Sequence, residues 1–177
     1  MASATALRWL LAGCLLLPAA AGAQPRADRE QDDGPRWWVE LEVKLPPFPK
    51  REDLLAFEVS PASSNRFLID PQSIAVGSDE VVRYTLVVRS PGGAENISYE
   101  GIRCETREQK YYALGRRDGT WSNARSSEWR YIEYKDLNRQ HGVLFADYFC
   151  PDKKRPIKSS AEAIQRFRYG APPRGGM

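Results

Sequence analysis

The chain has 177 residues, of which 42% are hydrophobic and 28% are charged. This length and composition favour a single globular domain and exclude a disordered chain. The net charge of +3 is too small to indicate nucleic-acid binding, and nothing in the sequence repeats at a fixed period.

Residues 1–23 have the pattern of a secretory signal. Arg8 is the only charged residue among them, an apolar run from Trp9 to Leu17 follows it, and Ala21-Gly22-Ala23 matches the small residues that signal peptidase accepts. The apolar run is far shorter than the ~20 residues of a membrane-spanning helix. The sequence therefore predicts a periplasmic protein, cleaved near Ala23, whose mature chain has no transmembrane segment.

A lipoprotein signal is the alternative. Leu11-Ala12-Gly13-Cys14 resembles a lipobox, in which Cys14 would be lipidated and would anchor the chain to a membrane. Only the residues from Trp9 to Gly13 would then remain as apolar core. The apolar run also continues beyond the cysteine, where lipoproteins usually turn polar. Both features favour cleavage after Ala23.

Order is expected to begin at Trp37. Residues 24–36 include one alanine and no larger apolar residue, which predicts a flexible leader. An alternating pattern follows and predicts a strand, in which the charged residues face water and the core-facing residues are Val39, Leu41, Val43 and Leu45. The prolines at positions 46, 47 and 49 then end regular structure.

Further alternation predicts an antiparallel sheet. Residues 54–59 and 66–69 are expected to form two short strands, or a brief helix followed by a strand. A turn at Asp70-Pro71 and another short strand at 74–76 follow. The clearest strand is 80–89, which would leave Arg83 and Arg89 in water and face the core with Val82, Tyr84, Leu86 and Val88.

The strand at 96–104 changes its alternation phase midway. Its apolar residues Ile97 and Tyr99 have odd numbers, whereas Ile102 and Cys104 have even numbers. One extra residue at Gly101 would put all four on the same face. The sequence therefore predicts a β-bulge at Gly101 that turns Cys104 inward.

The second half of the chain adds strands and then helices. Residues 109–114 and 129–134 are predicted strands, and Asp118-Gly119 is a hairpin signal. Helical spacing predicts a helix over 138–149, and Ser159 and Glu162 form a capping box for a last helix that Gly170 ends. The predicted fold is α+β, mainly antiparallel β-sheet with one or two C-terminal helices. We place one domain with one disulfide at 37–170 and a disordered tail at 171–177.

Cleavage of the signal leaves two cysteines, Cys104 and Cys150. Export places them in an oxidising compartment, so we predict that they form a disulfide. It would close a loop of about 47 residues, which is worth about 4 kcal/mol in the chain-entropy treatment. The functional alternative is a reactive cysteine beside His141, which needs a free thiolate. Two cysteines in an oxidising space favour the structural bond.

No motif for catalysis, a metal or a cofactor stands out. His141 is the only histidine, too few ligands for a metal site, and we expect it to be packed or hydrogen-bonded. Glycoside hydrolysis needs two carboxylates at a set distance. The sequence shows no such pair among its many acids, which include Glu100, Glu105, Glu108 and Asp118. We therefore predict no catalytic, cofactor-binding or metal-binding residue, and leave open whether the chain is an enzyme.

Charge is distributed unevenly along the chain. Residues 24–100 include 9 basic and 14 acidic residues, a net charge of −5, and residues 101–177 include 16 basic and 9 acidic residues, a net charge of +7. Either the two halves face each other within the fold, or a basic surface binds an anionic partner. The candidate partner-binding residues are Arg103, Arg107, Arg116, Arg117, Lys153, Lys154 and Arg155.

Four short motifs resemble the cryptic neisserial protein family. They are G-I-R-C-E-T-R-E-Q-K at 101–110, G-T-W at 119–121, D-Y-F-C-P at 147–151 and R-F-R-Y-G at 166–170, and the resemblance covers 37–170. It implies an exported protein of a Gram-negative bacterium and no enzymatic activity or catalytic residue.

Two functions remain open from the sequence. The first is a non-enzymatic cell-envelope binding or structural module whose basic C-terminal half meets anionic lipid, lipopolysaccharide or an acidic envelope protein. The second is an enzyme that acts on envelope polymers through paired carboxylates. A deep cleft with two close carboxylates would favour the enzyme, and a basic surface would favour binding.

Overall fold

A computed structural model of the chain describes residues 37–133 and 139–170. The predicted signal at 1–23, leader at 24–36 and tail at 171–177 lie outside the described residues. The described part belongs to one compact unit that begins at Trp37, so the prediction of a single domain is confirmed.

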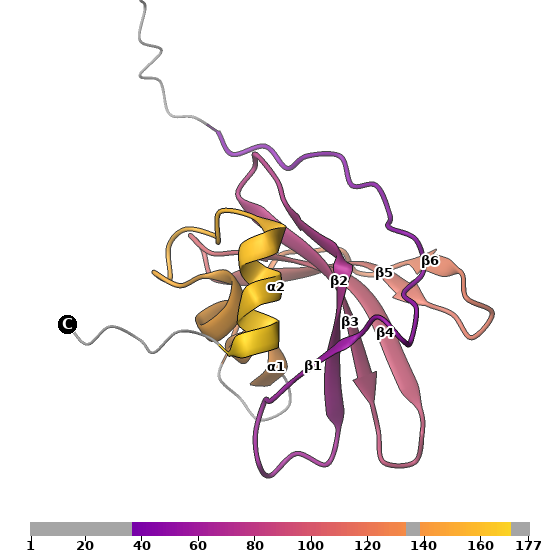
Figure 1. The fold of residues 1–177 in the computed structure, drawn as a ribbon. Helices are drawn as coiled ribbons and strands as arrows, with labels where there is room; N and C mark the ends of the chain where they lie inside the picture. Colours follow the sequence, from indigo (N-terminus) through magenta and orange to yellow (C-terminus); the bar gives the residue numbers. More distant parts are fainter. Residues whose placement is uncertain (1–36, 134–138, 171–177) are drawn as a thin grey trace, which may run out of the picture. The chain divides into compact units, whose positions relative to one another are not determined.

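A seven-stranded antiparallel sheet forms the centre of this unit (Figure 1). Neighbouring strands follow chain order from β1 to β6, and β7 pairs with β5 beside β6. The strands are β1 (Leu55–Phe57), β2 (Arg66–Val76), β3 (Val81–Arg89), β4 (Glu95–Arg103), β5 (Glu108–Gly115), β6 (Trp121–Asn123) and β7 (Arg130–Tyr131). This is the predicted α+β class with a mainly antiparallel sheet.

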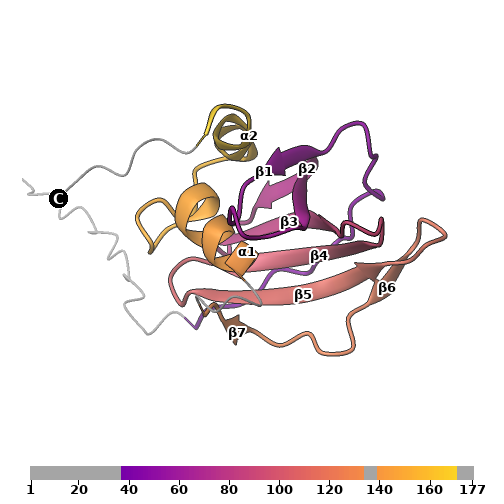
Figure 2. The same ribbon diagram turned by 90° about the horizontal axis from the view of Figure 1, so that it is seen from below.

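The helical segments of the described residues, α1, η2 and α2, cover one face of the sheet (Figure 2). The predicted helix at 138–149 is α1 (Arg139–Val143) followed directly by the π-helix η2 (Leu144–Phe149). The last helix is α2 (Ser160–Tyr169). Ser159 caps it, since its side chain accepts a hydrogen bond from the Glu162 amide, and Gly170 follows it with a φ of 86°.

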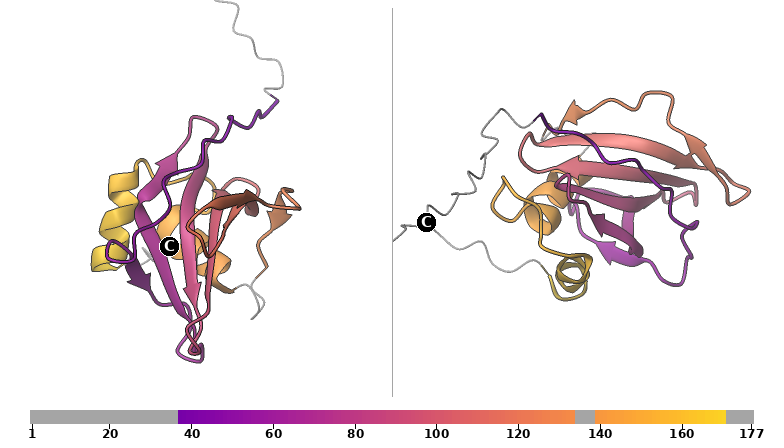
Figure 3. Two further views of the ribbon diagram at one scale, coloured as in Figure 1. Left: turned by 90° about the vertical axis from the view of Figure 1, so that its right-hand side faces the viewer. Right: turned by 90° about the horizontal axis from the view of Figure 1, so that it is seen from above.

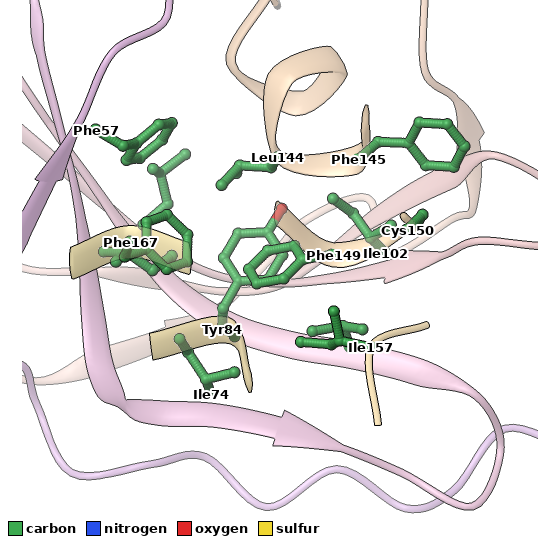
Figure 4. Packing of buried hydrophobic residues seen from close by; sticks show 14 of the residues in the cluster. Phe57, Ile74, Tyr84, Ile102, Leu144, Phe145, Phe149, Cys150, Ile157 and Phe167 are labelled. Atoms are coloured by element: carbon green, nitrogen blue, oxygen red, sulfur yellow. The ribbon is translucent and has the colours of Figure 1, made fainter. Parts of the chain in front are cut away.

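The core lies between this face and the helices (Figure 4). The ring of Tyr84 lies against the ring of Phe149, with 4.9 Å between centroids, and both side chains are fully buried. A disulfide between Cys104 and Cys150, with Cα atoms 5.5 Å apart, joins the end of β4 to the segment before α2. The predicted disulfide is therefore confirmed, and it removes the thiol that a reactive cysteine beside His141 would need.

The other face of the sheet is covered by residues 37–50, which we call the strap (Figure 3). The strap has no regular secondary structure, so the predicted strand at 39–45 is wrong. Its orientation is also opposite to the prediction: Val39 is 74% exposed, whereas Glu40 bonds to the sheet residues Lys110 and Tyr112. The reason is that side chains hold the strap, and none of the strands in the described residues pairs with its backbone.

Because both faces of the sheet are covered, the structure differs from the sequence prediction at two further places. Arg83 was expected in water, but it is only 6% exposed and forms an ion pair with Asp79 at 2.6 Å. On β4, Tyr99 is buried on the strap side, where its ring contacts Trp121, and Ile102 is buried in the core on the helix side. The phase change in β4 therefore reflects burial on both faces.

The bulge predicted at Gly101 is wrong for the same reason. Pairing of β4 with β3 runs without a register shift. The shift lies between β4 and β5, where Tyr99 pairs with Ala113 and Glu100 with Tyr111, so that Tyr112 of β5 is the extra residue. Gly101 has a different role: a Cβ there would lie 2.7 Å from the Tyr112 hydroxyl oxygen.

The predicted turn at Asp70-Pro71 also differs from the structure. β2 continues through this point as one strand, and its pairing with β3 shifts register between Asp70 and Ala75. The Ser73 hydroxyl donates to the Asp70 carbonyl and accepts from the Thr85 amide, so it replaces part of the interrupted ladder.

Candidate functional site

A buried carboxylate marks the centre of the helix-bearing face. Glu100 of β4 is 1% exposed, and three polar groups converge on it. The Tyr84 hydroxyl donates to Oε2 at 2.8 Å, the Ser98 hydroxyl donates to Oε1 at 2.5 Å, and His141 Nε2 lies 2.9 Å from Oε2. The expectation that His141 is packed or hydrogen-bonded is thus confirmed.

Strand register and one helix bring these four residues together. Tyr84 and Glu100 are paired positions on β3 and β4, and Ser98 lies two residues before Glu100 on the same face of its strand. His141 comes from α1. Burial raises the pKa of Tyr84 well above its ordinary value, and the nearby charge of Glu100 adds to this shift. Tyr84 therefore remains a hydrogen-bond donor.

Glu100 and Ser98 also line a groove of about 1190 Å³ on this face. Strands β2 to β7 and Gln140 of α1 contribute to it, and its lining is rich in serine and asparagine. The polar lining residues are Ser63, Asn65, Asn96, Ser98, Ser122, Asn123, Ser126 and Gln140, and the apolar ones include Phe67, Leu86, Val88, Ile97 and Leu114.

Three arginines line the groove as well. Arg116 follows β5, Arg125 follows β6, and Arg130 is the first residue of β7; all three are exposed. Arg130 donates to the Ser126 hydroxyl at 2.8 Å. None of the three forms a salt bridge within the part of the chain that the structure describes. The groove therefore has guanidinium groups available for an anion.

Both carboxylates of the groove already have partners within the fold. Glu95 accepts from Arg89 at 2.6 Å and from Arg51 at 2.9 Å, and Glu100 is held in the network described above. Burial raises the pKa of Tyr111, the tyrosine of the lining; the nearby Glu100 charge raises it further, and Arg130 opposes the shift. The Tyr111 hydroxyl is therefore a neutral polar group in the groove.

This arrangement does not suit hydrolysis by paired carboxylates. Glu95 and Glu100 are five residues apart on β4, which places their Cα atoms about 16 Å apart in an extended strand. Glycosidases place their two carboxyl groups roughly 5–9.5 Å apart. Across residues 37–133 and 139–170, no cluster of three or more histidines, cysteines or acids is arranged to hold a metal ion.

The seven basic residues singled out in the sequence fall into two groups. Arg116 and Arg117 lie in the β5–β6 hairpin and line a second hollow, of about 850 Å³, on the strap side. The other group is at the opposite end of the sheet, about 25 Å away along β5. There the disulfide brings the loop after Cys150 to the end of β4, and the residues are Arg103, Arg107, Lys153, Lys154 and Arg155.

Within the second group, side chains differ in availability. Arg103 stacks on Trp38 of the strap, 3.8 Å from the ring centroid, and lies near Glu105 and Glu108. Arg155 pairs with Asp152 at 3.0 Å. Lys153 and Lys154 are exposed. The seven residues therefore do not form one continuous patch.

Sequence reasoning missed Arg125 and Arg130, because they lie in a polar stretch between short strands. It also did not single out Glu100 from the other acids. One signal was present: Glu100 shares its alternation phase with Ile102, which is the phase that faces the core. An acid in that phase is a candidate for a buried, hydrogen-bonded position.

The CNP1-like family model matches residues 33–168 of the chain. No curated protein and no solved structure matches. The family match supports the predicted resemblance at the level of an uncharacterised family, and the neisserial attribution stays a prediction. Among the described residues, no helix is long and apolar enough to cross a bilayer.

Proposed function

The chain belongs to the CNP1-like family, a membership that assigns no activity, and we propose that it is an exported, non-enzymatic binding module of the cell envelope. Its ligand is an anionic saccharide chain, such as that of lipopolysaccharide, which lies in the sheet groove. The proposal rests on one observation: the groove has three arginines without salt bridges in the described structure, while both of its carboxylates are already paired or hydrogen-bonded.

The lining chemistry supports a saccharide. Arginine binds phosphate and carboxylate groups through two parallel hydrogen bonds. The serine, asparagine and glutamine side chains of the groove can both donate and accept, as sugar hydroxyls do. A lipid surface would instead meet a convex basic or apolar face.

Export is part of the proposal. The signal pattern at 1–23 predicts cleavage near Ala23 and release into the periplasm, with lipidation of Cys14 as the alternative. The Cys104–Cys150 disulfide supports an oxidising compartment. The resemblance to neisserial proteins favours a Gram-negative envelope.

Binding of purified lipopolysaccharide to charge-reversal variants tests the function. The Arg125→Glu, Arg130→Glu variant should bind about tenfold more weakly, because each lost contact is a hydrogen bond between charged groups. Lys153→Glu, Lys154→Glu is the matched control: it changes the net charge equally at two exposed positions at the other end of the sheet.

The comparison has three informative outcomes. Loss of binding in the groove variant alone, weakened further by salt, supports the proposal. Loss in the lysine variant alone moves the ligand to the loop after Cys150. Equal binding by all three proteins, or none by the unmodified chain, contradicts the groove as the ligand site.

A further inference from the structure

The central part of the strap has a self-complementary sequence. Residues 41–45 read Leu-Glu-Val-Lys-Leu. If two copies pair antiparallel about Val43, Leu41 of one copy lies opposite Leu45 of the other, and Glu42 lies opposite Lys44. Each of these pairs occurs twice, so one register matches apolar with apolar and acid with base throughout.

The side chains concerned are available for pairing. Leu41 is 44% exposed and Leu45 is 41% exposed, and Glu42 and Lys44 are also exposed. No salt bridge involves Glu42 or Lys44 within the described residues. Exposed leucines in an otherwise anchored segment indicate a surface that a partner covers.

The backbone of the strap also has an open edge. In residues 37–133 and 139–170, no strand pairs with 41–45. The Leu41 amide donates to the Asp79 carboxylate at 2.9 Å, which directs that amide toward the protein. In an extended chain, the amides and carbonyls of positions 42 and 44 point the opposite way.

We infer that the strap is the interface of a symmetric dimer with a second copy of this chain. Residues 41–45 of the two copies form a short antiparallel ladder about Val43, in which positions 42 and 44 exchange four backbone hydrogen bonds. The prolines at 46 and 47 stop the ladder, and the two-fold symmetry closes it, so the assembly ends at two copies. The interface is small, which makes the dimer a weak one.

Cysteine crosslinking of the whole chain, with Cys14 replaced by serine so that it adds no further thiol, tests the register. In the proposed ladder Val43 lies on the two-fold axis in a non-hydrogen-bonded pair, in which the two Cα atoms are about 4.5 Å apart, within disulfide reach. Val43→Cys should therefore form a covalent dimer under mild oxidation. Glu42→Cys should crosslink to Lys44→Cys when the two variants are mixed, and each alone should crosslink much less.

Charge exchange provides an independent test by sedimentation equilibrium. Lys44→Glu places like charges opposite each other twice and should weaken dimerisation about tenfold. The Glu42→Lys, Lys44→Glu double variant restores opposite charges and should dimerise within about twofold of the unmodified chain. Lys50→Glu, which changes the net charge as Lys44→Glu does but lies outside the ladder, is the control and should change little.

Each result decides the inference. Crosslinking at Val43 together with rescue by the double variant supports the dimer. A chain that stays monomeric at high concentration and gives no Val43→Cys dimer, with unchanged circular dichroism, overturns it and assigns the strap edge to a different occupant. Dimerisation that Lys44→Glu leaves intact also overturns it, because the interface would then lie elsewhere.

Discussion

Replacing Glu100 with leucine is the sharpest test of the buried network. Leucine is close to glutamate in size but accepts no hydrogen bond, so Tyr84, Ser98 and His141 would lose their common acceptor. Leaving a buried polar group without a partner costs about 1–3 kcal/mol, and three such groups lose their acceptor here. We expect Glu100→Leu to lower the free energy of unfolding by about 4 kcal/mol, near the lower end of that sum.

A graded series separates the acceptor from the charge. In Glu100→Gln the amide oxygen still accepts from Tyr84, and the amide nitrogen can donate to the Ser98 hydroxyl, so we expect a loss of about 1–2 kcal/mol. Tyr84→Phe removes one of the three donors and should cost about 1 kcal/mol. Glu105→Gln, at an exposed turn position, is the control and should stay within about 0.5 kcal/mol.

The assay is equilibrium unfolding in urea with the disulfide intact. If the variants share the same dependence of the free energy of unfolding on urea concentration, differences in their midpoints report differences in stability. The reasoning is refuted if Glu100→Leu is no more destabilising than Glu100→Gln. That result would mean that the three donors find other partners, and that the carboxylate does not organise this face.

Three further predictions concern the strap, the disulfide and a close contact. Burial opposes ionisation of Glu40, but hydrogen bonds from neighbouring side chains outweigh it and lower the pKa of Glu40. The stability that this carboxylate contributes is present at neutral pH and is lost on acidification. The free energy of unfolding should therefore depend less on pH between about 5 and 3 in Glu40→Gln than in the unmodified chain. Replacing Cys104 and Cys150 with serine should lower the free energy of unfolding by about 4 kcal/mol, and a loss below about 1 kcal/mol would contradict the disulfide as the main covalent constraint. Gly101→Ala would place a Cβ 2.7 Å from the Tyr112 hydroxyl oxygen. Thermal unfolding should therefore show a free energy of unfolding lower by about 1–3 kcal/mol, whereas an unchanged midpoint temperature would mean that the tyrosine moves freely.

Local patterns predicted the parts of the fold that depend on local physics. The alternation in β3 identified Tyr84 and Leu86 as core residues, and the Ser159 cap and Gly170 marked the ends of α2. The disulfide was predicted by counting the cysteines that would remain after the proposed signal cleavage. Each of these features depends on residues close in sequence or on the compartment.

The errors at Arg83 and Gly101 share one physical cause, which is a distant segment. The strap covers the second face of the sheet, so Arg83 is buried and β4 carries apolar residues on both faces. Alternation within a strand cannot report what a segment 40 or more positions away will cover, and the search for a single apolar face therefore placed a bulge at Gly101.

The candidate site was the least predictable part. Glu100 and His141 are 41 positions apart and meet only because α1 packs on β4. The groove draws its arginines from the ends of β5, β6 and β7, and nothing in the local sequence of Arg125 or Arg130 marks them. Sequence reasoning chose basic residues by charge density along the chain, and therefore selected Arg116 but neither Arg125 nor Arg130.

Hydrogen–deuterium exchange of the chain with and without a lipopolysaccharide saccharide tests the central claim most directly, because it locates the ligand without any substitution. A saccharide bound in the groove should slow exchange at 96–100 and 122–130, which line it, and leave exchange at 151–158 unchanged. Protection confined to 151–158 or to the strap would contradict it.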